Sequence, residues 1–476
     1  MMLSNVGSWT PAQVPQAAAF FPSGPEDVAE VGSLRFLSGV ARHFRNPVGF
    51  FQEFHERFGP SFETRLPTGR RFLFETRTEQ VQEVLTATDN PRFGCPFAKS
   101  SRQGHGLAFL LGSENVFSGS GQAWETALSA IKPHLEGRRM HTPEMFDKIG
   151  GVLDAHLDRL AARLGAGEAV VDVQPVMQAA ALDVAMQTMF GTRLSDAELQ
   201  QTQKAFDTVS AWVARETLNP TDVSLSRMFG KLGEAYERLQ GLAERVISDR
   251  RASGQDGEDV LGGLLSARDE HGQPFSDERL RNEVLTLMLA GHETTSTWLS
   301  WAVSLLARHP QAVSKVEEQV AGLEGRLPDP GEVRDLTAVQ DALMESLRLH
   351  SPAYFVAREA TADTTLGGRE VKQGTTVVMS VHQMHRSEEQ WGVERTGFPA
   401  DEFHPERFEQ PARSKFFPFG GGNRVCAGFA LARVEAALML TKVVQRFEIL
   451  PTSGPLEVAS DLSVHPREAT VRLRVR

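Results

Sequence analysis

Helical spacing of apolar residues dominates this sequence. Apolar positions recur every three or four residues over long stretches, which is the pattern of a helix that buries one face. The first such stretch, 46–58, predicts an amphipathic helix. Further helices are predicted over 78–86, 121–132, 142–164, 175–190, 196–215, 226–253, 277–308, 310–323 and 336–350.

Extended segments are fewer and shorter. Two strands, 61–65 and 71–75, are predicted around the turn Pro67-Thr68-Gly69. Extended structure also dominates 360–382, a Pro- and Phe-rich irregular stretch runs through 398–418, and strands close the chain from about residue 447. The balance predicts a mainly α fold with small β-sheets.

Charge and cysteine content narrow the class of protein. The chain has 476 residues, a formal net charge of −11 with both signs mixed, and two cysteines. Nothing in this charge pattern indicates nucleic acid. So few cysteines argue against a disulfide-built secreted protein and for a reducing compartment, so we expect a cytoplasmic location. No run reaches the ~20 apolar residues of a membrane span, so no transmembrane anchor is predicted.

The strongest chemical signal is Cys426. It follows a glycine-rich loop, Phe419-Gly420-Gly421-Gly422, and comes just before a strongly apolar helical stretch from Ala427 onward. A helix N-terminus favours a thiolate over a thiol, and the glycines allow a flat partner to approach closely. A buried structural cysteine is the ordinary explanation of a lone cysteine. The alternative is an iron ligand, with Arg424 as a cation for an acidic group of the cofactor.

The complete spacing F-G-x-G-x-R-x-C-x-G from Phe419 to Gly428 resembles the haem loop of the cytochrome P450 superfamily, and the chain is similar to its soluble bacterial members. The resemblance implies haem b with Cys426 as iron ligand, and a cofactor site that includes Phe419, Gly420, Arg424 and Gly428. It also implies a triangular, helix-rich prism around a buried haem. We therefore expect a single haem domain over 26–476, preceded by a flexible arm over 1–25 that lacks the basic residues of a signal peptide.

A second motif, Ala290-Gly291-His292-Glu293-Thr294-Thr295, lies inside the predicted helix 277–308. Thr294 can bond to the carbonyl of Ala290 one turn earlier and loosen the helix. A hydroxyl and an acid there suit oxygen chemistry that consumes protons. The resemblance implies that Ala290 and Gly291 line the haem site, Thr294 orients the bound oxygen and Glu293 relays protons. A helix kink with a solvated glutamate is the plainer explanation.

Three charged residues form a third pattern. Glu345 and Arg348 are three apart in a predicted helix and can form an ion pair. The resemblance implies that Arg407, in Phe403-His404-Pro405-Glu406-Arg407-Phe408, joins this pair and that the three charges hold the thiolate loop. Their role would be structural.

The resemblance is incomplete near Trp124. The family often has W-x-x-x-R here, with both side chains on haem propionates, but this chain has Leu128 in place of the arginine. We expect Trp124 to donate its indole N–H to a propionate. Arg358 is the candidate for the missing cation, and His134 is a weaker one.

The substrate pocket is predicted by position alone. The expected wall residues are mostly apolar, with His292 as a polar contact near the iron: Phe109, Phe206, Trp212, Leu289, His292, Tyr354, Phe355 and Leu462. Each of them is more often plain core. Together they favour a hydrophobic substrate, which is a terpenoid, fatty acyl, steroid-like or polyketide compound.

The resemblance implies a haem–thiolate monooxygenase that uses O2 and two electrons from NAD(P)H, delivered by a ferredoxin or flavodoxin and its reductase. Two alternatives stay open: an enzyme of the same fold that uses or rearranges peroxides, and a non-catalytic haem sensor. Basic residues form a candidate docking patch for an acidic partner, or are scattered solvated charges: Lys132, Arg138, Arg139, Arg413 and Lys415.

Overall fold

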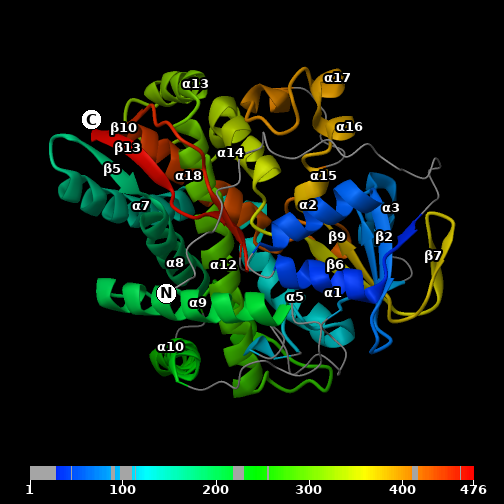
Figure 1. Ribbon diagram of the computed structural model, residues 1–476. Helices are drawn as coiled ribbons and strands as arrows, with labels where there is room; N and C mark the ends of the chain where they lie inside the picture. Colours follow the sequence, from blue (N-terminus) through cyan, green and yellow to red (C-terminus); the bar gives the residue numbers. More distant parts are fainter. Residues whose placement is uncertain are drawn as a thin grey trace.

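The computed structural model describes most of the chain (Figure 1): residues 28–43, 46–86, 92–96, 110–112, 114–217, 230–254, 257–409, 416–460 and 462–476. The arm predicted over 1–25 lies outside the described residues, as do Phe109, Arg413 and Lys415. In the part that is described, no helix is both long and apolar enough to cross a membrane.

Helices make up most of the molecule, and the predicted mainly α fold is confirmed. They are α1 Ser33–Arg42, α2 Pro47–Phe58, α3 Thr78–Thr86, α5 Gly121–Leu135, α6 Gly137–Met140, α7 Pro143–Leu164, α8 Gln174–Phe190, α9 Asp196–Thr217, α10 Lys231–Ser253, α11 Val260–Ser266, α12 Asp277–Leu306, α13 Pro310–Ala321, α14 Thr337–Leu349, α15 Val381–Met384, α16 Glu388–Trp391, α17 Val393–Thr396 and α18 Phe429–Arg446. Short 3₁₀ turns are η3 Val333–Asp335, η4 Pro405–Glu409 and η6 Gly422–Arg424.

In the described ranges the strands form one six-stranded sheet and three smaller ones. The order in the large sheet is β1 (Ala29–Glu30), β2 (Ser61–Arg65), β3 (Arg71–Glu75), β9 (Thr376–Met379), β6 (Val356–Ala360) and β4 (Phe93–Gly94). The others are β10 (Phe447–Leu450) with β13 (Thr470–Val475) and β5 (Glu168–Asp172), the hairpin β11 (Val458–Ser460) and β12 (Val464–Pro466), and the hairpin β7 (Thr364–Leu366) and β8 (Arg369–Val371).

Helix α12 runs through the centre of the molecule and packs against α8, α10, α14 and α18 (Figure 1). Its N-cap is Ser276, whose hydroxyl accepts a hydrogen bond from the N–H of Arg279. From Leu285 to Leu306 the helix is buried, except at Ala290, Gly291 and Thr294. A central helix that is buried on nearly all sides from Leu285 onward therefore becomes accessible at one short stretch.

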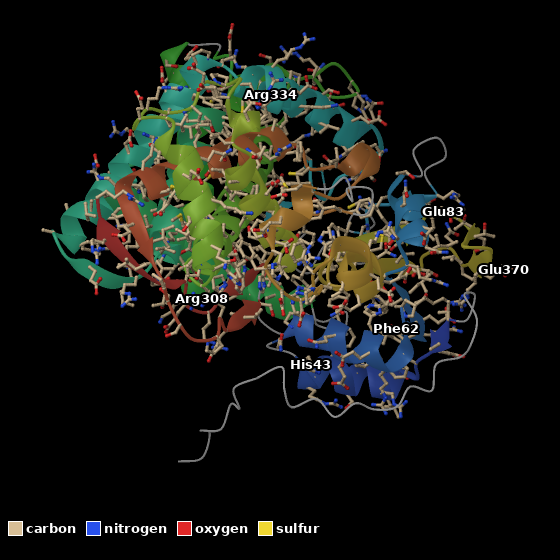
Figure 2. All side chains as sticks on the ribbon, turned by 90° about the horizontal axis from the view of Figure 1, so that it is seen from above. His43, Phe62, Glu83, Arg308, Arg334 and Glu370 are labelled. Atoms are coloured by element: carbon tan, nitrogen blue, oxygen red, sulfur yellow. The ribbon has the colours of Figure 1, made fainter. Side chains whose placement is uncertain are left out.

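An aromatic cluster attaches the N-terminal helices to the large sheet. Phe50 and Phe54 of α2 pack with Phe36 of α1, and the rings of Phe62 and Phe74 stack on adjacent strands at 4.6 Å between centroids. Figure 2 shows this part of the molecule, with the labelled His43 and Phe62, at the lower edge of the view on the blue N-terminal ribbon. The sheet is thus a separate wall beside the helical body, with its own apolar core.

Candidate functional site

The cysteine loop is shaped by its glycines. Gly420 and Gly422 have φ of +70° and +68°, a backbone conformation that favours glycine. A Cβ added to Gly422 would lie 1.9 Å from the carbonyl oxygen of Leu85, so the loop presses directly on the end of α3. The N–H of Cys426 donates to the carbonyl of Phe419 at 3.0 Å and closes the loop. Only a chain without side chains at these points can make this turn.

The thiol of Cys426 is accessible although protein surrounds it. The residue is exposed, yet burial raises the pKa of its thiol, and the N–H of Gly428 lowers it only in part. Both observations hold for a group that faces an internal space and not bulk water. Helix α18 begins at Phe429, two residues later than predicted. The predicted thiolate belongs to the iron-bound state, in which the metal displaces the thiol proton, and it stays a prediction.

The opening in α12 borders the same region. Ala290 and Thr294 are exposed in an otherwise buried stretch, and the Thr294 hydroxyl donates to the Ala290 carbonyl at 2.8 Å, as the spacing predicts. The indole of Trp298, one turn further along, contacts the ring of Phe419 at 6.0 Å between centroids. The cysteine loop and the accessible face of α12 therefore lie close together.

Two residues of the α12 motif point elsewhere. Gly291 faces α8, because a Cβ there would lie 3.0 Å from Met189 and 3.3 Å from Ala185. His292 is completely buried and stacks on Phe206 of α9 at 5.2 Å. Residues two apart on a helix point to nearly opposite sides, so His292 lies away from the face of Ala290 and Thr294. The ring of His292 therefore lies on the α9 side of the helix, whereas the expectation that the backbone of Gly291 lines the cofactor site stays a prediction.

Glu293 is held by a residue that sequence reasoning missed. Its Oε1 accepts a hydrogen bond of 2.7 Å from the hydroxyl of Ser463. That hydroxyl also lies 3.2 Å from the hydroxyl of Thr297. Ser463 is 170 residues away from Glu293 in the sequence, and no motif marks it, so only the fold reveals the contact.

Two arginines and a tryptophan form a cationic group near the loop. The guanidinium of Arg424 lies over the ring of Trp124 at 4.3 Å and donates to the carbonyl of Gly119 at 2.6 Å. Burial and the charge of Arg424 lower the pKa of Arg358 to about 10. Among the described residues neither arginine has a carboxylate partner. Two half-buried cations that repel one another fit a ligand with acidic groups.

The other candidates near Trp124 do not supply a cation. Leu128 is half-buried on α5. His134 lies near the other end of that helix, where its ring contacts the carbonyl of Glu258 at 3.1 Å and the start of α11. Arg358 therefore remains the residue that the structure offers in place of the missing arginine.

The three charged residues of the third pattern meet in the core. Arg348 makes two bonds to Glu345, at 2.7 and 2.8 Å, and Arg407 approaches the same carboxylate at 3.2 Å. All three side chains are fully buried. Arg348 also donates to the carbonyls of His385 and Ala400, so one carboxylate and two guanidinium groups hold several loops together.

A histidine connects this network to the cysteine loop. The Nε2 of His385 accepts the N–H of Phe417 at 3.0 Å. Phe417 lies two residues before Phe419, where the loop begins. Arg348 donates to the carbonyl of His385, and the His385 ring binds the backbone next to the cysteine loop. His385 therefore links the position of the loop to the ion network of Glu345, Arg348 and Arg407.

The predicted pocket residues divide into three groups. Phe206 and Leu289 line a small cavity of about 10 Å³, together with Leu110, Leu111, Val209, Tyr236, Leu239 and Leu285. Trp212 is buried on α9, and Leu462 is half-buried beside Ser463. Tyr354 and Phe355 instead pack on Phe51 of α2, at 6.0 and 5.8 Å between ring centroids, so their rings belong to the aromatic cluster at the sheet.

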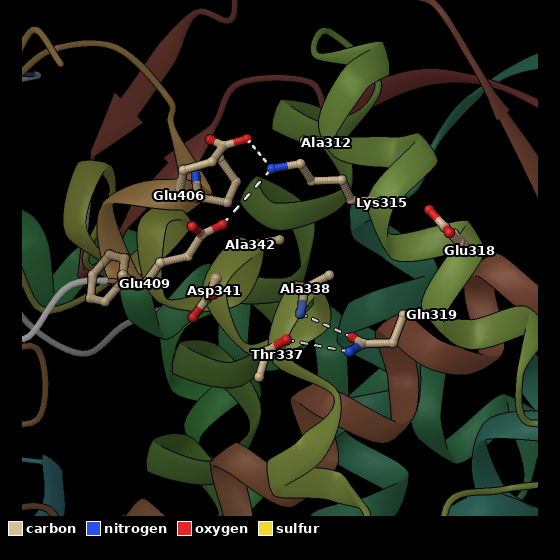
Figure 3. Close-up of a pocket in the computed structure, with 12 residues that line it drawn as sticks. Ala312, Lys315, Glu318, Gln319, Thr337, Ala338, Asp341, Ala342, Glu406 and Glu409 are labelled. Atoms are coloured by element: carbon tan, nitrogen blue, oxygen red, sulfur yellow. Dashed lines mark hydrogen bonds and ion pairs between the residues drawn. The ribbon is translucent and has the colours of Figure 1, made fainter. Parts of the chain in front are cut away.

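A larger groove of 740 Å³ lies elsewhere, between α13, α14 and η4 (Figure 3). Its lining mixes polar and apolar side chains, and Lys315 pairs with Glu406 at 2.8 Å and with Glu409 at 3.9 Å. Gln319 caps the start of α14 by accepting the N–H of Ala338 at 2.9 Å. These contacts hold η4, which carries Arg407, against α13. The groove is therefore part of the packing between α13, α14 and η4.

The expected docking patch is only partly described. Lys132 lies 3.8 Å from Glu136, Arg139 pairs with Glu258 at 2.8 Å, and Arg138 is exposed. Two of the three described cations thus already have acidic neighbours at the surface.

The residues of the site fit a metal ion that is bound as part of a larger cofactor. Over the described ranges, no group of three or more His, Cys, Asp or Glu residues could hold a metal ion. Cys426 is therefore a single ligand, which suits an iron whose other positions are filled by a macrocycle. The accessible thiol, the opening at Ala290 and Thr294, and the cations Arg358 and Arg424 match such a group in chemistry.

Comparison with known proteins agrees with this reading. A profile of the family described as Cytochrome P450 matches residues 22–472. The chain is 29% identical to a cyclooctat-9-en-7-ol 5-monooxygenase of Streptomyces melanosporofaciens, over 89% of each chain. It is 30% identical to a pentalenene oxygenase of Streptomyces avermitilis, over 69% of this chain and 74% of that one. It is 28% identical to a putative cytochrome P450 135A1 of Mycobacterium tuberculosis, over 91% and 92%.

Proposed function

The chain belongs to the cytochrome P450 family, and from this premise we propose that it oxygenates a hydrophobic small molecule with electrons from NAD(P)H. The observation that carries the proposal is the accessible thiol of Cys426 inside the protein, next to the opening in α12. The family implies a haem cofactor, O2 and a redox partner. That the haem is haem b, that the partner is a ferredoxin or flavodoxin with its reductase, and that the enzyme is cytoplasmic are parts of the proposal.

Residues on two sides of the site would hold the cofactor. Cys426 would bind the iron through its sulfur, which loses its proton to do so. Arg358, Arg424 and the indole N–H of Trp124 would bind the propionates, which would neutralise the two arginines. When bound, the haem supplies an iron that binds O2 and takes up electrons from the partner.

Two side chains of α12 are placed to hold and transfer protons at the accessible face. The Thr294 hydroxyl lies at the accessible face, and while it donates to Ala290 its oxygen can still accept a hydrogen bond. Glu293 is the adjacent acid, and its carboxylate is almost completely buried. We propose that Glu293 supplies protons and that Thr294 directs where they are delivered.

The substrate class rests on the apolar lining. The side chains around Phe206 and Leu289, from α9, α10 and α12, are aliphatic and aromatic, and they enclose only about 10 Å³, which is the space of about one water molecule. They indicate an apolar region on this side of α12 and not a preformed substrate pocket. Two relatives are named for oxygenating pentalenene and cyclooctat-9-en-7-ol. A terpenoid is therefore the first class to test.

The decisive test combines spectroscopy and turnover. The reduced protein with carbon monoxide should show the strongly red-shifted Soret band of a thiolate complex, and Cys426→Ser should abolish it. With NAD(P)H, ferredoxin and reductase, the protein should convert a terpenoid that shifts the iron spin state. Turnover with peroxide alone would indicate the peroxide-dependent class, and a normal spectrum without turnover by either route would indicate a sensor.

Replacement of the hydroxyl at the opening tests the proton assignment. Thr294→Ala should leave substrate binding unchanged, because the hydroxyl bonds within its own helix to the Ala290 carbonyl, but should lower product per NAD(P)H consumed about 10-fold or more, since general acid catalysis contributes about 10²–10⁴-fold. Thr294→Ser keeps the hydroxyl and should retain most of the coupling. Equal coupling in the Ala and Ser variants would contradict the assignment.

A further inference from the structure

The hydroxyl of Ser463 is the nearest described polar partner of the acid on α12. It donates to Oε1 of Glu293 at 2.7 Å and lies 3.2 Å from the hydroxyl of Thr297, one turn further along the same helix. Ser463 and Glu293 are both buried, with 2% and 8% of their surface exposed. In such surroundings a hydrogen bond to a carboxylate is strong and directional.

The backbone next to Ser463 is fixed on both sides. The neighbouring Val464 starts strand β12 and is fully buried. Its carbonyl accepts the indole N–H of Trp301 at 2.8 Å, and its N–H donates to the carbonyl of Pro352 at 3.1 Å. The β11–β12 hairpin is thus fastened along α12 at this point, and the serine hydroxyl has little freedom to move.

The carboxylate, in contrast, is carried by a long side chain. Glu293 has several rotatable bonds, and its position on α12 is beside Thr294, the residue at the opening. A bond from a fixed hydroxyl to one carboxylate oxygen restricts the arrangements that this side chain can adopt. Such prior orientation is a recognised source of catalytic rate.

We propose that Ser463 is a positioning residue for Glu293: it holds the carboxylate at the edge of the opening in α12, ready to exchange protons on the Thr294 side. This inference rests on the proposed oxygenase function for its catalytic meaning, but the hydrogen bond itself does not. A role limited to packing is the competing explanation, because most buried hydroxyls are hydrogen-bonded somewhere.

The first experiment observes the carboxylate directly. Infrared difference spectra between the wild type and Glu293→Gln isolate the carboxylate band of Glu293. Ser463→Ala should shift this band, and Ser463→Thr should restore it. Ser300→Ala removes another buried hydroxyl of α12, one that bonds to the carbonyl of Ser296 within the helix, and should leave the band unchanged. A band that is the same in wild type and Ser463→Ala would overturn the proposal, whatever reaction the protein performs.

The second experiment measures the consequence. In Ser463→Ala the product formed per NAD(P)H should fall about 10-fold, which corresponds to about 1.4 kcal/mol, while the red-shifted carbon monoxide spectrum and the substrate-induced spin shift stay as in wild type. Ser463→Thr should recover the coupling, and Ser300→Ala should not lose it. Unchanged coupling in Ser463→Ala would refute the positioning role. Absence of any turnover in the wild type would instead refute the oxygenase function and leave the infrared result to decide the hydrogen bond.

Discussion

Removal of the buried negative charge of Glu345 should destabilise the cysteine loop and reduce haem incorporation. Glu345 receives two bonds from Arg348 and one from Arg407, and no part of these three side chains reaches solvent. Glu345→Gln keeps the size of the side chain but leaves two buried guanidinium groups without their carboxylate. We expect the variant to fold poorly around the haem.

The magnitude follows from burial. Breaking a buried ion pair by neutralising one partner costs about 3–5 kcal/mol, and here two arginines share the lost partner. Whole proteins are stable by about 5–15 kcal/mol, so this single substitution removes a large part of the margin. Burial lowers the pKa of Arg407 and Glu345 raises it in part, so the carboxylate offsets part of the cost of burying this cation.

A matched surface pair provides the control. Glu332 makes two bonds to Arg326, at 2.6 and 2.8 Å, but both side chains are largely exposed. Surface pairs contribute little, so Glu332→Gln should leave urea unfolding and haem content near wild type. Both variants are compared by the urea midpoint and by the fraction of protein with the red-shifted carbon monoxide spectrum. Equal behaviour of the two variants would refute the reasoning, since charge loss without burial would then explain the effect.

Three further outcomes are expected. Burial and the charge of Arg348 lower the pKa of His385 from 6.5 to about 3. As the pH falls, the His385 ring is therefore protonated in the unfolded chain before it is protonated in the folded protein. About 5 kcal/mol of the free energy of unfolding is lost as pH falls from 6.5 toward 3. His385→Gln keeps an acceptor for the loop and should make the urea midpoint fall less steeply with pH over that range than in the wild type. The same pH dependence in both proteins would contradict the role of His385. Arg358→Leu should speed haem transfer to an acceptor protein about 10-fold, and an unchanged rate would exclude a propionate contact. Gly422→Ala should lower the free energy of unfolding by more than about 1 kcal/mol, whereas Gly151→Ala, in open space on α7, should not lower it.

Local patterns predicted the long elements well, and distant pairings poorly. The expected helix 142–164 is observed as Pro143–Leu164, and the strands 61–65 and 71–75 have the expected bounds. The prediction omitted α11, which at 7 residues is too short for a helical period to show. It also omitted β5, whose partner β13 lies about 300 residues further along the chain. No local signal reports a partner that far away.

The contacts of the candidate site also divide into those that follow from spacing within one helix and those that depend on the tertiary fold. The bond from Thr294 to Ala290 and the ion pair of Glu345 with Arg348 depend on spacing within one helix, so the sequence contains them. The direction of His292 required knowing which side of α12 meets α9, and a 30-residue helix that is buried nearly all round gives no apolar stripe to show it. The contact of Ser463 with Glu293 required the placement of a whole hairpin.

The ion network and the cysteine loop act as one unit because a neutral histidine joins them. Arg348 holds the His385 carbonyl at 2.7 Å, and the His385 ring accepts the N–H of Phe417 at 3.0 Å. An accepting nitrogen must carry no proton, and burial, together with the nearby cation of Arg348, keeps the ring neutral by lowering its pKa. The arginine therefore positions the histidine and also contributes, beside burial, to preserving the form that can bind the loop. Loss of Glu345 disturbs the first of these actions, and acid defeats the second, so both perturbations should release the cysteine loop before the helical core unfolds.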